Sequence, residues 1–264
     1  MGSFLWYLAN TTHSFKSLFG ARSACDYCHT TLKRYELIPV FSWFYQKGKC
    51  SHCGAKLSSS YLISEILTAL SFGVVWSLVG TLSFSLQVMI GLLLACMVFI
   101  AMVDIRKKEL SIPAFTLALI LFFWLYYLTQ ATNWTNIGII ALCWFALWFI
   151  IRLLGVLIHK VKYHEWGQGL GFGDVLFAGL LGLLFGLAIQ FTPLQSGFTG
   201  SDYYFFIFLT LALHMFASSI CGILGYSILK DERLAFIPYM LWWFLIMTIV
   251  LLYFSDTILS FLAF

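Results

Sequence analysis

Long apolar runs, separated by short polar segments, dominate the chain after residue 61. Seven such runs can be marked, and they cover residues 62–80, 84–103, 113–129, 136–158, 173–190, 204–229 and 235–262. About 20 apolar residues suffice for a helix to cross the hydrocarbon of a bilayer. A β-barrel would instead show short segments of alternating polarity. The pattern predicts an all-α polytopic membrane protein, a bundle of about seven to eight transmembrane helices.

The chain before residue 62 divides into a short apolar segment and a polar block. Residues 2–9 are apolar but too few to span a bilayer, and they lack the basic start and the cleavage site of a secretory signal. We therefore expect residues 1–20 to form part of a first span. Residues 21–61 are the only sizeable polar block and are expected to fold as a small separate domain, ahead of a transmembrane domain over 62–264.

Composition narrows the class of protein. The 264 residues are 61% hydrophobic and 10% charged, whereas a soluble domain has about 25% charged residues. These values exclude an ordinary cytosolic enzyme, a disordered chain and a secreted disulfide scaffold.

The distribution of basic residues predicts an orientation. Of the 15 Lys and Arg residues, seven lie before residue 61, three at 106–108, three within 152–162 and two within 230–233. With seven spans, all of these segments fall on one side of the membrane, and the opposite loops near 81–83, 130–135 and 191–203 carry none. Since basic loops stay in the cytoplasm, we expect the polar N-terminal block to be cytoplasmic.

Two Cys-x-x-Cys pairs lie in this polar block. Cys25 and Cys28 form the first pair, Cys50 and Cys53 the second, and 21 residues separate them. This spacing is typical of a four-cysteine zinc ribbon, in which each pair supplies two thiolates from one tight turn. Disulfides and a redox-active pair are the competing interpretations, and a reducing cytoplasm disfavours disulfides. We expect a structural zinc ion, because a block of about 40 residues cannot build a sufficient core alone.

Two acidic residues lie at the predicted cytoplasmic ends of spans. Asp104 follows the run 84–103, where we expect the helix to end, and Asp174 opens the run 173–190 after a Gly-x-Gly sequence. Both can be interfacial residues, and an acid at a helix N-terminus such as Asp174 is favoured by the helix dipole. The second interpretation is an aspartyl dyad, in which the carboxyl groups share one proton and hydrolyse a peptide bond without a metal.

Two other titratable residues lie in the apolar runs. Glu65 lies one turn into the run 62–80, where the helix dipole favours an acid. His214 is the titratable side chain furthest from the ends of a run, and we interpret it as a core histidine in preference to a proton relay.

These motifs resemble those of the bacterial type IV prepilin peptidases, GxGD-type intramembrane aspartyl proteases that are often also N-methyltransferases. The resemblance extends over nearly the whole chain, through the segments 22–28, 36–43, 48–53, 61–65, 112–113, 171–174 and 236–239. It implies that Asp104 and Asp174 are the catalytic pair. It also implies cleavage of a short basic leader from pilin-like substrates at the cytoplasmic face of the inner membrane, then methylation of the new N-terminus from S-adenosylmethionine.

Three other functions remain open on the sequence. A presenilin-like protease also uses a GxGD motif, but it has no reason to carry a zinc ribbon. A zinc-regulated transporter or channel would use Asp104 and Asp174 as ion or proton sites. An assembly subunit would bind a pilin-like helix without cutting it. The partners we expect are a pilin-like protein and the lipid bilayer, and no nucleic acid.

Overall fold

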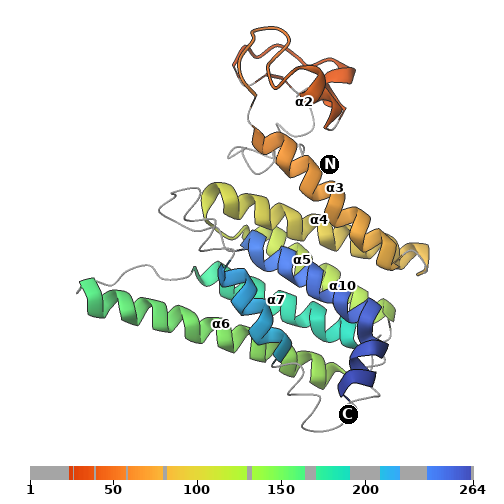
Figure 1. The fold of residues 1–264 in the computed structure, drawn as a ribbon, viewed down its shortest axis with the longest axis vertical. Helices are drawn as coiled ribbons and strands as arrows, with labels where there is room; N and C mark the ends of the chain where they lie inside the picture. Colours follow the sequence, from red (N-terminus) through yellow and green to blue (C-terminus); the bar gives the residue numbers. More distant parts are fainter. Residues whose placement is uncertain are drawn as a thin grey trace. The chain divides into compact units, whose positions relative to one another are not determined.

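The computed structural model describes residues 24–25, 27–38, 40–57, 59–79, 82–129, 133–163, 171–190, 209–220 and 237–262. Within these ranges the regular structure is helical, apart from two isolated β-bridges. The labelled helices are η2 (Arg34–Leu37), α2 (Phe41–Tyr45), α3 (Ser59–Val79), α4 (Phe84–Lys107), α5 (Ile112–Thr129), α6 (Trp134–Tyr163), α7 (Phe172–Ile189) and α10 (Ile237–Leu262). Figure 1 shows their course.

The predicted all-α membrane fold is confirmed. Four segments in the described part of the chain are long and apolar enough to cross a membrane: Phe84–Ile105, Ile112–Thr129, Trp134–Leu157 and Phe172–Ile189. Three shorter apolar helices cover Thr68–Ser77, Leu209–Ile220 and Ile237–Ile249. The predicted partial span over residues 1–20 lies outside the described residues, so the total number of spans stays a prediction.

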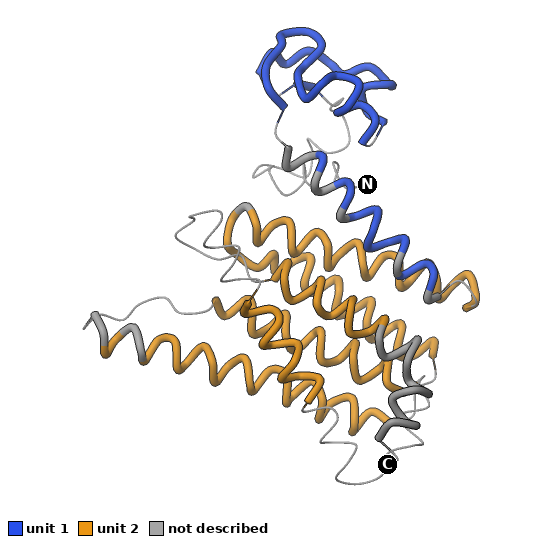
Figure 2. The backbone as a smooth tube through the Cα atoms, viewed as in Figure 1, with its two compact units in different colours: residues 1–77 blue, residues 78–264 orange. Residues whose placement is uncertain are grey.

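The chain divides into two compact units, Met1–Ser77 and Leu78–Phe264, which Figure 2 colours separately. The first unit contains the predicted cysteine domain and most of α3. The second contains the helices from α4 onward, and both aspartates that the sequence singled out. The boundary between the cysteine domain and the transmembrane domain, predicted after residue 61, stays a prediction.

Helix α7 is the centre of the second unit. It packs most extensively against α6 and also contacts α10 and α5, while α4 packs against α5 and α10 (Figure 1). A larger share of α7 is buried than of the other three membrane-spanning candidates. Phe177 and Phe185 of α7 and Trp144 of α6 are fully buried. The N-terminus of α7, where Asp174 lies, is thereby fixed by packing on three neighbouring helices.

Glycines allow α6 and α7 to approach closely. A Cβ atom at Gly182 would lie 2.8 Å from Cα of Ala141 and 2.9 Å from Cβ of Trp144. One turn further along, a Cβ at Gly186 would lie 3.0 Å from Cα of Ile137. Small residues at this spacing let two membrane helices pack backbone to backbone.

We predict that Gly182→Ala lowers the stability of the second unit by about 1–3 kcal/mol, because the added methyl group meets the backbone of α6. Gly138→Ala is the matched control, since a Cβ there meets nothing within 4 Å. Thermal unfolding in detergent, followed by tryptophan fluorescence, measures the difference. Equal melting temperatures for the two variants would contradict the close packing of α6 and α7.

Candidate functional site

The four predicted cysteine ligands come together in the first unit. Their sulfur atoms all lie within 4.8 Å of one another, and the Sγ atoms of Cys25 and Cys53 are 3.9 Å apart. Four sulfurs bound to one zinc ion at about 2.3 Å would be about 3.8 Å apart at the corners of a tetrahedron. This cluster could therefore hold a metal ion.

Both cysteine pairs adopt the same local fold, 25 residues apart. The amide of Cys25 donates to the carbonyl of Thr30 at 3.1 Å, and the amide of Cys50 donates to the carbonyl of Ala55 at 2.8 Å. Bridges Ala24–Thr31 and Lys49–Lys56 close the two turns. His29 in the first turn and Gly54 in the second both have positive φ, 54° and 70°. The tight turn expected around the second pair is thus observed, and the first pair forms its counterpart with a histidine.

Amide groups in these turns point at the sulfurs. The amide of Tyr27 donates to Sγ of Cys25, and the amide of His52 donates to Sγ of Cys50, each at 3.5 Å. Hydrogen bonds from Thr30 lower the pKa of the Cys28 thiol to about 6. The amide of Ala55 favours ionisation of Cys53, yet burial and the neighbouring cysteines raise its pKa to about 11. Amide groups that donate to sulfur in this way suit thiolates that bind a metal ion.

Glu36 connects helix η2 with the second cysteine turn, and sequence reasoning gave it no structural role. Its side chain is buried, accepts a hydrogen bond from the amide of Lys33 at 2.6 Å, and accepts another from the hydroxyl of Ser51. The Ser51 hydroxyl and the Lys33 amide hold the pKa of this carboxyl below its usual value. Glu36 thus stays ionised and braces the turn that carries Cys50 and Cys53.

Asp104 is buried, with 5% of its surface exposed, and it lies inside α4. The sequence predicted a helix end at Asp104, and this is wrong: α4 continues to Lys107, and Lys108 in the left-handed conformation ends it. The helix continues because its last turn is capped by the Lys108 amide, which donates to the carbonyl of Asp104 at 2.9 Å. Oδ2 of Asp104 accepts a hydrogen bond of 3.1 Å from the amide of Ile237, the first residue of α10.

Asp174 lies in the first turn of α7 with 7% of its surface exposed. Its Oδ2 accepts a hydrogen bond of 3.0 Å from the amide of Gly171, the residue that caps the helix. Asp174 also interacts electrostatically with Asp104. Within the described residues, each of the two carboxyl groups is held through Oδ2 by one backbone amide.

Gly173 lets the start of α7 approach the segment that follows α4. A Cβ atom at this position would lie 2.7 Å from Cβ of Leu110, in the segment that links α4 to α5. The start of α7 therefore approaches the chain just after α4, and this approach requires a residue without a side chain. This steric requirement explains why the second position of glycine in the Gly-x-Gly-Asp sequence, Gly173, is occupied by that residue.

We predict that Gly173→Ala reduces the leader cleavage that the family resemblance implies by about 10²-fold, since a displacement near 1 Å can have this effect on a catalytic geometry. Gly179→Ala is a suitable control in the same helix, because a Cβ there makes ordinary contacts of 3.6 Å with Phe145. Leader removal from a co-expressed substrate, quantified by immunoblot, gives the readout. Activity of Gly173→Ala equal to that of Gly179→Ala would contradict the role of this glycine.

His214 lies in the helix Leu209–Ile220, is fully buried, and hydrogen-bonds to α10. Its Nε2 donates to the carbonyl of Met240 at 2.9 Å, while Nδ1 has no partner among the described residues. Its ring also packs on Trp144, with 4.8 Å between centroids. His214 thus holds the first turn of α10, whose Ile237 amide binds Asp104. The role of Ile237 was missed because a backbone amide has no sequence signature.

The three further cysteines of the chain and Glu65 have simpler positions. Cys96 and Cys143 lie in α4 and α6, and in the described part of the chain neither joins a metal-ligating group. Cys221 lies outside the described residues. Glu65 accepts a hydrogen bond of 2.8 Å from the amide of Val40, so it binds the loop before α2 as well as lying near the start of α3.

Comparison with known protein families gives a match at the N-terminus. Residues 1–79 match the model of the bacterial Peptidase A24 N-terminal domain, a range close to that of the first compact unit. The chain is also similar to several curated prepilin leader peptidases. The resemblance to prepilin leader peptidases is confirmed.

Three relatives of this kind illustrate the extent of the similarity. The prepilin leader peptidase/N-methyltransferase of Bacillus subtilis is 39% identical over 72 residues, 27% of this chain and 29% of that protein. The protein of the same name from Dichelobacter nodosus is 31% identical over 156 residues, 58% and 50% of the two chains. The type 4 prepilin-like proteins leader peptide-processing enzyme of Escherichia coli O78:H11 is 33% identical over 181 residues, 63% and 59%.

The chain spans at most 59% of the length of these three prepilin leader peptidases. No solved structure matches the chain. The similarity to the relatives named as leader peptidases covers between 27% and 63% of this chain.

Proposed function

We propose that this chain is an intramembrane aspartyl endopeptidase that removes the short basic leader of pilin-like proteins. The observation that supports this most is the pair of buried carboxyl groups, Asp104 and Asp174, which interact electrostatically. Each is oriented by one backbone amide through Oδ2. Two carboxyl groups sharing one site hold a single proton between them, which provides an acid and a base in one place.

The proposed reaction is hydrolysis of a peptide bond by water. The ionised carboxylate removes a proton from the water, whose oxygen attacks the scissile carbonyl carbon. The protonated carboxyl group donates a hydrogen bond to the carbonyl oxygen as negative charge develops on it. The C–N bond of the tetrahedral intermediate then breaks, and the leaving amine takes the proton that the first carboxylate removed from water. The pair ends the reaction with one proton, as it began. The backbone amides of Ile237 and Gly171 fix the two side chains, so little reorganisation accompanies the reaction. No metal or side-chain nucleophile takes part.

The position of the pair suits a substrate with a basic leader and an apolar helix. Asp104 is followed by Arg106, Lys107 and Lys108, and by the positive-inside rule this segment lies at the cytoplasmic face. A basic leader stays on that side, while the apolar helix lies in the bilayer. The bond between them is then at the depth of the two aspartates, at the cytoplasmic face of the bacterial inner membrane.

The cysteine cluster is proposed to bind zinc through Cys25, Cys28, Cys50 and Cys53. Four thiolates in a tetrahedron suit zinc, and a site with four protein ligands leaves no open position for a substrate. The ion would supply folding energy to the first unit and would take no part in hydrolysis.

Methylation of the new N-terminus from S-adenosylmethionine is proposed as a second activity. Its support is the name of the relatives, prepilin leader peptidase/N-methyltransferase. The methyl donor would supply an electrophilic methyl group to the free amine. The geometry of the described residues assigns no side chain to this step.

Co-expression with a tagged prepilin-like protein tests the proposed function. We expect the leader to be lost when this chain is present and retained when it is absent, and the mass of the new N-terminus to increase by one methyl group if the second activity is retained. A substrate that keeps its leader despite good expression of both proteins would favour a transporter, a channel or an assembly subunit.

A further inference from the structure

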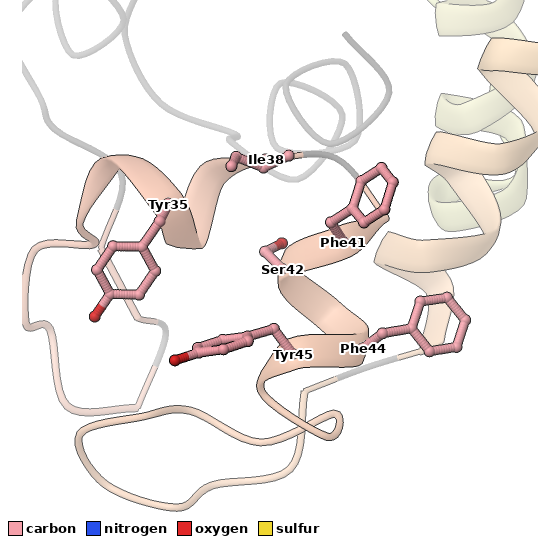
Figure 3. Close-up of a pocket in the computed structure, with 6 residues that line it drawn as sticks. All are labelled: Tyr35, Ile38, Phe41, Ser42, Phe44 and Tyr45. Atoms are coloured by element: carbon pink, nitrogen blue, oxygen red, sulfur yellow. The ribbon is translucent and has the colours of Figure 1, made fainter.

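The first unit exposes a cluster of apolar side chains around an open pocket. Figure 3 shows that Tyr35 and Tyr45 lie on one side of the pocket and Phe41 and Phe44 on the other. Phe41 is 75% exposed, Phe44 is 61% exposed and Tyr45 is 78% exposed. Helix α2, which carries these three residues, has no buried residue of its own. An exposed cluster of large apolar side chains marks an interaction surface.

A hydrogen bond holds this aromatic cluster close to helix α3, which the apolar run 62–80 predicts to be a membrane span. The amide of Val40, the residue before α2, donates to Oε2 of Glu65 at 2.8 Å. Val40 has a φ of 64°, a conformation that a β-branched residue rarely adopts, so its position is imposed by its surroundings. Glu65 lies six residues into α3, about 9 Å from the start of that helix. The aromatic cluster is thereby tied to α3 at the level where its apolar run begins.

Basic residues predominate among the exposed charges of the cysteine domain, although an acid, Glu65, binds the Val40 amide beside the cluster. Within residues 24–57, the described charged side chains that are exposed are all basic: Lys33, Arg34, Lys47, Lys49 and Lys56. The described acid of this segment, Glu36, is buried. The ammonium group of Lys33 lies 5.9 Å from the centre of the Tyr35 ring, so charge and aromatic surface adjoin. Such a surface complements an anionic one.

We propose that this cluster docks on the lipid surface, with Phe41, Phe44 and Tyr45 inserted among the headgroups of the leaflet at which α3 begins. Aromatic side chains are favoured at this depth because their rings are apolar and, in tyrosine, one end is polar. The surrounding lysines and Arg34 attract anionic headgroups. Contact with lipid also removes from water the exposed apolar surface of α2. The cysteine domain is then an interfacial domain, fixed to the bilayer by both α3 and the aromatic cluster.

Photo-crosslinking of the full chain tests this docking. A photoreactive phenylalanine (p-benzoyl-phenylalanine) is placed at Phe44 or at Tyr45, and the protein is reconstituted in vesicles of phosphatidylcholine and phosphatidylglycerol. After irradiation, mass spectrometry identifies what is attached at each position. Tyr27, which is 69% exposed in the first cysteine turn and does not line the pocket, is the matched control. We expect phospholipid adducts at Phe44 and Tyr45, several-fold more than at Tyr27.

Two variants of Glu65 test how the cluster is held. Glu65→Ala removes the acceptor for the Val40 amide and should reduce the phospholipid adduct at Phe44 several-fold. Glu65→Gln retains an amide oxygen that can accept the same hydrogen bond, so its adduct yield should equal that of the parent protein. Equal yields from both variants would contradict the anchoring by Glu65.

Two results would overturn the proposal itself. One is lipid labelling at Tyr27 as strong as at Phe44, which would mean that the domain meets lipid without a preferred face. The other is crosslinking of Phe44 and Tyr45 to a second protein or a second copy of this chain, without lipid adducts. That result would make the cluster a protein interface.

Discussion

Asp104→Asn and Asp174→Asn should each reduce leader removal by about 10²- to 10⁴-fold, the contribution typical of a positioned general acid or base. Asparagine cannot take a proton from water and cannot share one with the other carboxyl group. It has nearly the same shape, and its side-chain oxygen can still accept the hydrogen bond from the amide of Ile237 or Gly171. The fold should therefore survive while the chemistry is lost. The measurement is the fraction of co-expressed tagged prepilin-like protein that has lost its leader.

Glu109→Gln is the control for these variants. Glu109 is an exposed acid in the link between α4 and α5, so the same chemical change is made near Asp104 without touching the pair. We expect its activity to equal that of the parent protein. Undiminished cleavage by either aspartate variant, at equal expression, would contradict the aspartyl mechanism and leave the transporter and assembly functions as alternatives.

Cys25→Ser or Cys50→Ser should release the bound metal and unfold the first unit. Binding of structural zinc contributes about 10–16 kcal/mol to the folding of small zinc domains, and loss of one of four thiolates removes much of this. The purified parent protein should contain one zinc ion per chain, and either variant close to none. Metal content is measured by elemental mass spectrometry. Unfolding is measured by limited proteolysis within the first unit.

Cys143→Ser is the matched control for the cysteine variants. Cys143 is an exposed cysteine of α6 in the second unit, and its loss should change neither metal content nor proteolysis. Two findings on the parent protein would together contradict the metal site. They are the absence of metal and the failure of thiol reagents to react with Cys25, Cys28, Cys50 and Cys53. That result would favour disulfides.

The membrane fold and the cysteine cluster could be predicted because each depends on local patterns. An apolar run of about 20 residues has few alternatives to a spanning helix. Two Cys-x-x-Cys pairs each form a turn through their own backbone, so the spacing alone specifies most of the site. The end of α4 could not be predicted in this way, because it depends on the left-handed conformation of Lys108, which is uncommon for a lysine. The burial of Asp104 could not be predicted either, because its partner, the amide of Ile237, lies 133 residues further along the chain.

Other parts of the site depend on contacts between distant segments. Glu36 looks like a surface acid in the sequence, yet it is buried under the second cysteine turn. Gly173 looks like part of a flexible loop, yet a glycine is required there because Leu110 lies too close for a side chain. Glu65 was explained by the helix dipole, and the hydrogen bond to Val40 adds a second role. Each of these depends on which surfaces meet, and residue spacing alone does not contain that information.

Cleavage of a leader by the purified chain is the decisive measurement for the proposed aspartyl peptidase. The protein is reconstituted in vesicles with a purified prepilin-like protein, and mass spectrometry determines the N-terminus of the substrate. We predict that the parent protein gives the substrate one new N-terminus, directly after the basic leader. With Asp104→Asn or Asp174→Asn the substrate should keep its leader intact. An intact leader with the parent protein, or the same new N-terminus with both variants, would contradict this prediction.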